Sequence, residues 1–260
     1  MTPPAGSSAL VARLRAAGCV FAEEEAALLE AEAPDSSALE AWVTRRVAGE
    51  PLEQIVGWAE FAGVRVTVAP GVFVPRRRSE LLADQVVRRA PRRALVVELC
   101  AGVAPIAAAA VRERPDLEVF AAEIDPVAVQ CARTNLGPDR VFPGDLYAAL
   151  PASLRGRIDV VVANAPYVPT DEIALMPREA RDHEPLVALD GGADGLDVHR
   201  RIASGLADWL APGGQVLIEI SPAQAPVLTA LLADIGMDTE IVRDDGLEAT
   251  VVRGWLSTTN

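Results

Sequence analysis

Three sites in the middle of the chain could together hold a nucleotide-type cofactor. An apolar run ending at Leu99 leads into the segment 100–104, Cys-Ala-Gly-Val-Ala, where small residues let the backbone approach a ligand. Glu123 stands about twenty positions further on, the spacing at which a carboxylate accepts hydrogen bonds from ribose hydroxyls. Asp145 could accept from an exocyclic adenine amine, and Leu146 could pack on the ring.

These residues also have purely structural interpretations. The loop with its single glycine, Gly102, fits an ordinary strand-to-helix turn equally well, and Glu123 could be a solvated strand end. Asp125 precedes Pro126, a favourable first residue of a helix, so we expect its side chain to cap that helix.

The segment Asn164-Ala165-Pro166-Tyr167 carries the most specific pattern in the chain. It directly follows an apolar run, and ligands of open parallel sheets bind beyond the carboxyl ends of the strands. We therefore expect it beside the cofactor loop. The alternative is a plain Asn/Pro turn with a core tyrosine.

A parallel sheet is needed to bring these segments together. From Ala94 onward, apolar runs too short for helices alternate with longer amphipathic segments, which is typical of a parallel sheet covered by helices on both faces. The expected strands are 94–99, 118–123, 140–142, 158–163 and 215–220. The expected helices are 105–114, 126–136 and 197–210, the last stopped by Ala211-Pro212-Gly213-Gly214. Segments 237–243 and 250–254 could close the sheet as an antiparallel pair, with Asp244-Asp245-Gly246 as their turn.

The first part of the chain has a different pattern. Apolar residues at helical spacing, interrupted at Gly18 and at 34–37, predict a small helical bundle. Alternating apolar residues over 61–68 predict a short hairpin. The expected organisation is a helical domain over 1–50, a linker with the hairpin over 51–78, and a catalytic domain over 79–260.

The composition of the chain limits which ligands the protein can bind and where in the cell we expect it. No apolar run of the 260 residues approaches the ~20 needed to span a bilayer, so we expect a cytoplasmic protein without membrane contact. The three cysteines lack metal-ligand spacing, so neither zinc nor a disulfide is expected. A net charge of -13 argues against nucleic acid as the main ligand. The basic run Arg76-Arg77-Arg78 could meet a carboxylate or phosphate, or be a solvated helix start.

The segment 164–167 resembles the Asn-Pro-Pro-Tyr signature of methyltransferases that modify amide or exocyclic amino nitrogens, with Ala165 in place of the first proline. The resemblance implies that Asn164 and the carbonyl of Ala165 each accept an N–H, so that the lone pair of the nitrogen faces the methyl group. Pro166 would stiffen the loop, and Tyr167 would pack against or hydrogen-bond the target group. These four are the expected catalytic residues.

Further segments are similar to the release-factor glutamine N5-methyltransferase family, the HemK/PrmC type, and together they cover nearly the whole chain. They are 50–57, 61–63, 73–76, 183–196 and 219–224. The resemblance implies an α/β, class I S-adenosylmethionine methyltransferase fold, with a doubly wound, mostly parallel sheet and a small N-terminal helical domain. It also implies methylation of the glutamine of a Gly-Gly-Gln tripeptide in release factors, by direct displacement without a metal. The expected cofactor-binding residues are Glu98, Cys100, Ala101, Gly102, Val103, Ala104, Glu123, Ile124, Asp145, Leu146 and Asn164.

The chain departs from the family pattern at two places. In the cofactor loop, Glu98 replaces an aspartate, Cys100 and Ala104 replace glycines, and the methyl groups of Val103 and Ala104 are expected to crowd the methionine portion. At the entrance, Arg77 and Arg78 replace a proline and a glutamate.

Two alternatives to release-factor methylation follow from these departures. One is a small-molecule or peptide methyltransferase of a biosynthetic pathway, which a deep closed pocket beyond Tyr167 would favour, whereas an open groove would favour a protein loop. The other is a non-catalytic binding protein with a degenerate cofactor loop. His183 and His199 are expected to be surface or helix-packing residues, because an oriented amide needs no strong base in contact.

Overall fold

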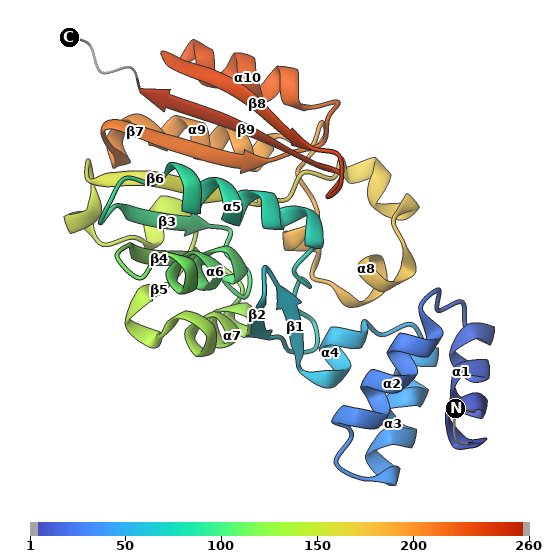
Figure 1. The fold of residues 1–260 in the computed structure, drawn as a ribbon. Helices are drawn as coiled ribbons and strands as arrows, with labels where there is room; N and C mark the ends of the chain where they lie inside the picture. The colour runs from blue at the N-terminus through green and yellow to red at the C-terminus, as the bar shows by residue number, and fades with distance from the viewer. Residues whose placement is uncertain (1–4, 257–260) are drawn as a thin grey trace.

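The computed structural model describes residues 5–256, with side chains from Ser8 onward. Its first part is a set of helices: α1 (Ala5–Ala16), α2 (Ala22–Glu32), α3 (Ser36–Val47) and the short α4 (Leu52–Val56). Asp35 begins α3 as a cap, its carboxylate accepting from the backbone N–H of Ala38 at 2.8 Å. These helices share an apolar core of their own, which includes Ile55 of α4 and so extends past residue 50. Figure 1 shows them at one end of the molecule.

A hairpin connects the helices to the rest of the chain. β1 (Trp58–Phe61) and β2 (Val64–Thr67) pair antiparallel, so the predicted hairpin is present, but it covers 58–67 and begins before the predicted range 61–68. Asn135 fixes β2 to the main domain, because its side chain bonds both the N–H and the C=O of Thr67, at 2.7 and 3.1 Å. A 3-10 turn, η1 (Arg77–Ser79), then leads into α5 (Glu80–Arg89).

The main domain is built on a seven-stranded sheet, ordered β5-β4-β3-β6-β7-β9-β8. Its strands are β3 (Leu95–Leu99), β4 (Glu118–Glu123), β5 (Val141–Pro143), β6 (Ile158–Ala163), β7 (Leu210–Glu219), β8 (Met237–Asp244) and β9 (Ala249–Leu256). The first five are parallel, and β9 runs antiparallel to both β7 and β8. The predicted doubly wound sheet with a closing antiparallel pair is therefore confirmed.

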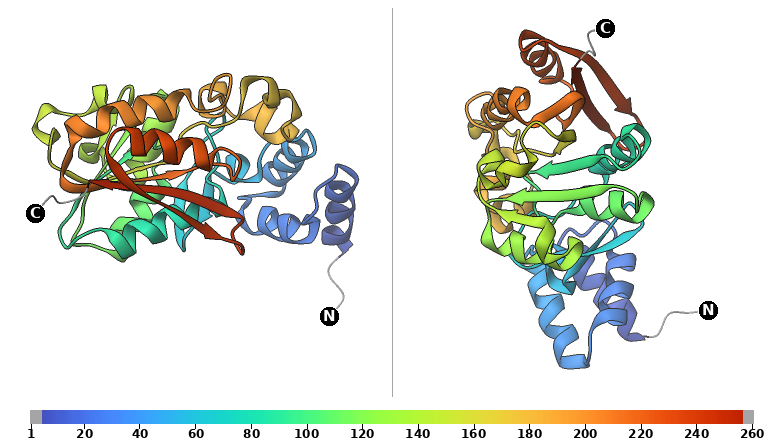
Figure 2. Two further views of the ribbon diagram at one scale, coloured as in Figure 1. Left: turned by 90° about the horizontal axis from the view of Figure 1, so that it is seen from above. Right: turned by 90° about the vertical axis from the view of Figure 1, so that its left-hand side faces the viewer.

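Helices cover both faces of this sheet (Figure 2). One face packs on α5, α6 (Pro105–Glu113) and α7 (Pro126–Leu136). The other packs on α9 (Asp197–Trp209) and α10 (Ala225–Asp234). The strands are apolar on both sides, as β3 illustrates with five buried residues in succession. The short α8 (Arg178–His183) lies between the main domain and the N-terminal helices, where its Glu179 pairs with Arg46 of α3 at 2.5 Å.

The predicted boundaries differ from the structure mainly at β7. The helix α9 ends at Trp209, close to the predicted position, but β7 begins at Leu210 and so includes residues 211–214, which were expected to lie before the strand. The pairing with β6 is irregular there, and a Cβ at Gly214 would lie 2.9 Å from the carbonyl oxygen of Ile158. The glycine therefore serves a bulge, where the chain needs a residue without a side chain. The strands of the closing hairpin are longer than predicted, since β8 continues to Asp244 and β9 covers Ala249–Leu256, and residues 245–248 connect them.

Candidate active site

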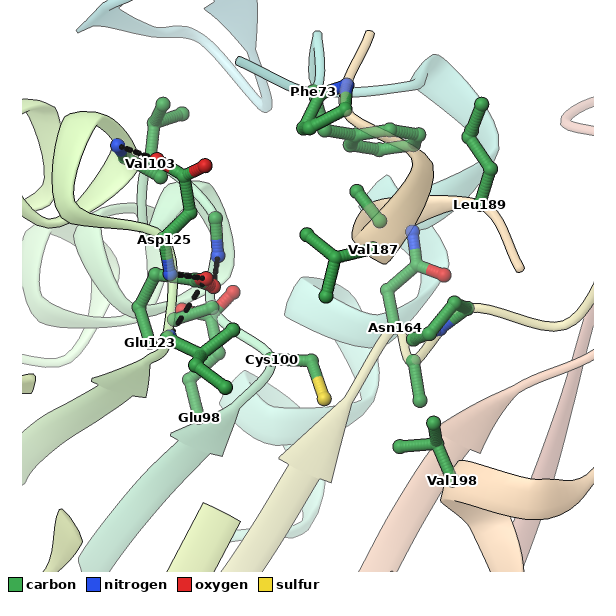
Figure 3. A pocket seen from close by; sticks show the side chains of 18 of the residues that line it. Phe73, Glu98, Cys100, Val103, Glu123, Asp125, Asn164, Val187, Leu189 and Val198 are labelled. Carbon is green, nitrogen blue, oxygen red and sulfur yellow. Dashed lines mark hydrogen bonds between the residues drawn. The ribbon is translucent and has the colours of Figure 1, made fainter. Parts of the chain in front are cut away.

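A pocket lies at the carboxyl ends of β3, β4, β5 and β6, where open α/β sheets bind their ligands (Figure 3). Part of its lining comes from the segments 98–106, 122–128 and 144–146, which we call the cofactor half. The opposite part, which we call the acceptor half, comes from 73–79, 164–168 and 185–189, together with Met176. The fold thus brings the predicted cofactor loop and the segment 164–167 to the two sides of one pocket.

Glu123, at the end of β4, is surrounded by backbone donors. Its Oε2 accepts from Gly102 N at 2.6 Å, and its Oε1 accepts from Ile124 N and Asp125 N at 2.8 and 2.7 Å. Burial raises the pKa of this carboxyl, whereas the three N–H groups oppose that rise because they stabilise the ionised form. The residue therefore joins the cofactor loop to the end of β4 and still lines the pocket.

Glu98 behaves differently, although it also lies near the carboxyl end of its strand and lines the pocket. Only 2 % of its surface is exposed, and its Oε2 accepts from Ala107 N at 2.7 Å, in the first turn of α6. Burial raises its pKa to about 8, so at neutral pH most molecules carry the neutral carboxyl group.

The loop 100–104 has the backbone of a glycine-rich turn although only one of its residues is glycine. Cys100, Gly102 and Ala104 all have left-handed conformations, with φ of 51°, 55° and 58°. The thiol of Cys100 points into the pocket, and burial raises its pKa, so it stays protonated. Val103 also faces the pocket, but Ala104 is fully buried and does not line it. Contrary to expectation, the methyl group of Ala104 therefore cannot crowd a ligand directly.

The remaining residues of the cofactor half lie close to their expected places. Ile124, Asp145 and Leu146 all line the pocket. Asp145 forms an ion pair with Arg201 of α9 at 2.6 Å, a partner that the sequence pattern did not reveal. Asp125 caps α7 as predicted, accepting from the first two free N–H groups of the helix.

Asn164 is held in one orientation by a neighbour from a distant part of the chain. Its Nδ2 donates to the hydroxyl oxygen of Ser79 at 3.0 Å, and Ser79 is itself buried. In the described part of the chain no group donates to the other amide atom, Oδ1, which therefore remains available as an acceptor. Asn164, Ala165, Pro166 and Tyr167 all line the acceptor half. Asn164 was expected among the cofactor-binding residues as well as the catalytic ones, and we assign it to the acceptor because it lies with this segment, after β6.

Tyr167 is fixed through its hydroxyl. It donates to Oε1 of Glu219, at the end of β7, at 3.2 Å, and Arg78 donates to the same oxygen through Nε, also at 3.2 Å. Burial is the main cause that raises the pKa of Tyr167. The phenol is therefore a neutral donor and no base.

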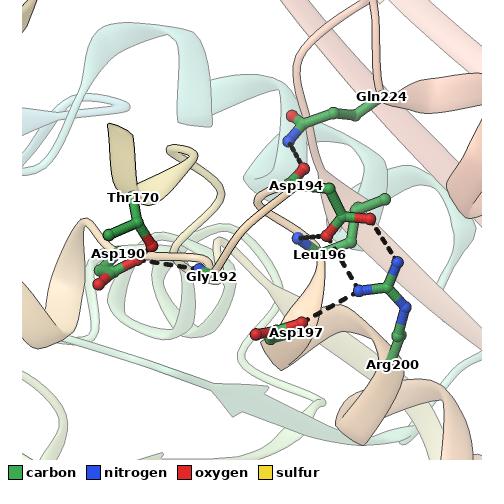
Figure 4. A network of polar contacts seen from close by, with 8 residues as sticks. All are labelled: Thr170, Asp190, Gly192, Asp194, Leu196, Asp197, Arg200 and Gln224. Atoms are coloured by element: carbon green, nitrogen blue, oxygen red, sulfur yellow. Dashed lines mark hydrogen bonds and ion pairs between the residues drawn. The ribbon is translucent and has the colours of Figure 1, made fainter. Parts of the chain in front are cut away.

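The loop that carries Asn164 and Tyr167 rests on the segment 190–195, and Figure 4 shows the polar contacts of that segment, with Gln224 bound to Asp194. The N–H of Gly191 donates to Val168 O at 2.9 Å. Gln224 bridges the two segments, since its Nε2 donates to the carbonyl oxygens of Tyr167 and Asp194, at 3.0 and 2.9 Å. The predicted motifs at 183–196 and 219–224 thus act as support for the acceptor half.

Two further contacts attach the entrance segment 73–76. Arg76 donates from Nη2 to both carboxylate oxygens of the buried Glu184, at 2.6 and 2.7 Å. Gln54 of α4 donates to Val72 O at 2.8 Å and to the carbonyl oxygen of His183 at 3.3 Å, joining the N-terminal helices to this segment. His183 ends α8, and neither it nor His199 lines the pocket.

His199 lies in α9 and is completely buried, and burial lowers its pKa to about 4. It is therefore neutral at physiological pH. The prediction that it is a helix-packing residue is confirmed by this position.

Comparison with known proteins agrees with this geometry. The family model described as Methyltransferase small domain matches residues 63–178. A solved methyltransferase from Pyrococcus furiosus has the same fold, with a TM-score of 0.57 and 18% identity over 74% of this chain and 89% of that chain. A 4-amino-L-phenylalanine/4-methylamino-L-phenylalanine methyltransferase from Streptomyces pristinaespiralis is 37% identical over 75% of this chain and 69% of its own length. The release factor glutamine methyltransferase of Mycolicibacterium smegmatis is also 37% identical, but over 81% of this chain and 82% of its own length. The chain belongs to the release factor glutamine methyltransferase family.

Proposed function

We propose that this methyltransferase transfers the methyl group of S-adenosylmethionine to the side-chain amide nitrogen of a glutamine, with a translation release factor as the acceptor. The orientation of Asn164 is the observation that carries the proposal. Its Nδ2 is bound to Ser79, so Oδ1 is left to accept an N–H at the border of the cofactor and acceptor halves.

The cofactor half offers the groups that S-adenosylmethionine needs. Glu123 has three backbone donors and yet lines the pocket, so its remaining lone pairs can accept from ribose hydroxyls. Leu146 presents an apolar surface for the adenine beside Asp145. The left-handed turns at Cys100 and Ala104 keep the loop geometry despite the lost glycines. The cofactor supplies an electrophilic methyl group on a sulfonium.

The acceptor half supplies alignment. The lone pair of an amide nitrogen is delocalised, so rate depends on holding the nitrogen with its lone pair toward the methyl carbon. Asn164 Oδ1 and the carbonyl of Ala165 would each accept one N–H of the amide. Tyr167 already donates to Glu219, so it packs against the acceptor and takes no proton. The extra proton on the methylated nitrogen would leave to water.

The rim of the acceptor half is suited to a protein loop. Leu175, Leu186 and Val187 are exposed apolar residues next to the lining residue Met176 and within the segment 185–189. Exposed apolar side chains that gather beside a pocket typically mark a binding surface. A release factor could cover them when its glutamine enters the pocket, in the cytoplasm where translation ends.

The test is methyl incorporation into a purified bacterial release factor, located by tandem mass spectrometry. We expect one added methyl group on the glutamine of the Gly-Gly-Gln tripeptide, and none with Asn164→Ala. Methylation elsewhere in the release factor, or equal incorporation by the variant, would contradict the proposal.

A small amine-bearing amino acid is a second candidate acceptor. The Streptomyces pristinaespiralis relative, whose name gives such a substrate, is as identical to this chain as the Mycolicibacterium smegmatis one. In the described structure no residue of α1–α4 lines the pocket. Parallel assays with the release factor and with 4-amino-L-phenylalanine distinguish the two acceptors. No described helix is long and apolar enough to cross a bilayer.

A further inference from the structure

The charges that line the pocket are divided between its two halves. The acidic lining residues Glu98, Glu123, Asp125 and Asp145 all lie in the cofactor half. The charged lining residues of the acceptor half are two arginines, Arg76 and Arg78. The remaining charged lining residue, Arg201 of α9, is paired with Asp145 of the cofactor half. This concentration of positive charge stands out in a chain whose net charge is -13.

The two arginines differ in how fully they are engaged. Arg76 is bound through both oxygens of Glu184, and its guanidinium lies 4.8 Å from the centre of the Phe73 ring, so it fixes the entrance segment. Arg78 has a single ion pair among the described residues, from Nε to Glu219, and 46% of its side chain is exposed. No hydrogen bond joins the Nη groups of Arg78 to a described carboxylate.

Glu219 binds Arg78 from the buried side, away from the pocket. It is 1 % exposed and does not line the pocket, so a ligand cannot reach it directly. Its Oε1 accepts from both Arg78 and Tyr167, which places the guanidinium 5.9 Å from the centre of the tyrosine ring. Since the ion pair uses Nε, the far edge of the guanidinium can meet a second carboxylate in the two-pronged geometry that arginine favours.

Arg78 lies on the side of the pocket where the acceptor is expected, away from the cofactor loop. The cofactor half is formed at the ends of β3, β4 and β5, whereas Asn164 follows β6 and Glu219 ends β7, on the opposite side of β6 from β3. Neighbouring strands are about 4.8 Å apart, so the partner of Arg78 lies two strands from the cofactor loop. Arg78 also directly precedes Ser79, the residue that orients Asn164.

We propose that Arg78 binds a carboxylate of the acceptor, and that the pocket takes free amino acids whose side chain carries an amide or amine nitrogen. The nitrogen would be held at Asn164 while the α-carboxylate meets the guanidinium edge. This inference rests on the proposed methyl transfer. It deepens the second candidate acceptor by naming the residue that would recognise a free amino acid, and it adds amino acids with a side-chain amide.

Calorimetry with matched ligands tests it without depending on turnover. L-Glutamine and 4-amino-L-phenylalanine are each titrated as the free acid and as the α-carboxamide, into protein saturated with S-adenosylhomocysteine. Wild type should bind at least one free acid about 10- to 100-fold more tightly than its carboxamide, the range for one charge-assisted hydrogen-bonded pair. Arg78→Ala should remove this preference, and Arg78→Lys should restore part of it.

Arg77→Ala is the matched control, because Arg77 is exposed, does not line the pocket and makes the same change in net charge. It should keep the wild-type preference, and all variants should bind S-adenosylhomocysteine equally. The proposal is overturned if wild type binds neither free acid or binds acid and carboxamide alike. It is also overturned if Arg77→Ala acts like Arg78→Ala, or if Arg78→Ala weakens S-adenosylhomocysteine, which would assign the arginine to the carboxylate of the cofactor. Release-factor methylation is measured separately. If it fails, the proposed protein acceptor is refuted, but a preference for the free acid over the carboxamide still supports the role of Arg78.

Discussion

Replacing Gly191 by alanine tests whether the segment 190–195 holds the acceptor loop in its working position. A Cβ at Gly191 would lie 2.7 Å from Pro166 O and 2.6 Å from Gly195 O, and both are backbone atoms. Ordinary contacts begin at 3.4 Å, so the Pro166 carbonyl would have to move by about 0.7 Å. Gly191 has no left-handed φ, so the effect would be steric alone.

This displacement predicts a loss of rate with little loss of cofactor binding. Since a misplacement of about 1 Å can cost roughly 100-fold in rate, we expect kcat to fall by roughly 10- to 100-fold. Overpacking should also lower the free energy of unfolding by about 1–3 kcal/mol. The assay is methyl transfer at saturating S-adenosylmethionine, with calorimetry of S-adenosylhomocysteine binding beside it.

Gly246→Ala is the matched control, because a Cβ there meets only a movable side chain, Asp244 Oδ1, at 3.3 Å. It should leave kcat unchanged. A wild-type kcat for Gly191→Ala would refute the reasoning, and so would a loss of cofactor affinity as large as the loss of rate.

Four further substitutions probe the two halves of the pocket. Asn164→Ala should lower kcat by roughly 100-fold at unchanged affinity for S-adenosylhomocysteine, because the nitrogen loses its orienting acceptor; an unchanged kcat would exclude this role. Glu123→Gln puts an NH₂ group against at least one backbone N–H, so the loop loses about 1.5–3 kcal/mol of charge-assisted hydrogen bonding. We expect calorimetry to show a cofactor Kd that is raised about 10-fold or more. Glu98→Gln should be nearly neutral in thermal unfolding near pH 4.5 and should stabilise the protein at pH 7. Because the folded pKa of Glu98 is raised from 4.5 to about 8, wild type should lose stability relative to this variant as pH rises between those values, and a constant difference would contradict the shift. Ala104→Gly should stabilise by about 0.5–1 kcal/mol, since φ is 58° there, whereas a lower melting temperature would show that the alanine is unstrained.

The sheet could be predicted from sequence because its strands are buried on both faces and read as short apolar runs. β4 and β6 begin and end at the predicted residues. β7 could not be bounded, because the glycines that usually end a helix here permit a bulge against Ile158. A local pattern cannot show which of these two uses a glycine serves.

The residues that directly follow strands were also predictable, since parallel strands deliver their carboxyl ends to one edge. Their supporting partners were not. Ser79, Arg201 and Gln224 act through contacts with residues 56 to 85 positions away along the chain. No spacing rule connects such pairs, because only the packing of helices on the sheet brings them together. Glu98 shows the same limit, since its place in the sequence suggests an ionised carboxylate and its burial makes it neutral.

Binding of S-adenosylmethionine to the purified protein tests the central claim most directly, because every step proposed for the acceptor half requires the cofactor in the other half. Calorimetry should show one site per chain with micromolar affinity, weakened in Glu123→Gln and unaffected in Asn164→Ala. Absence of binding by the wild type would contradict the account and leave a methyltransferase fold whose altered loop serves another ligand.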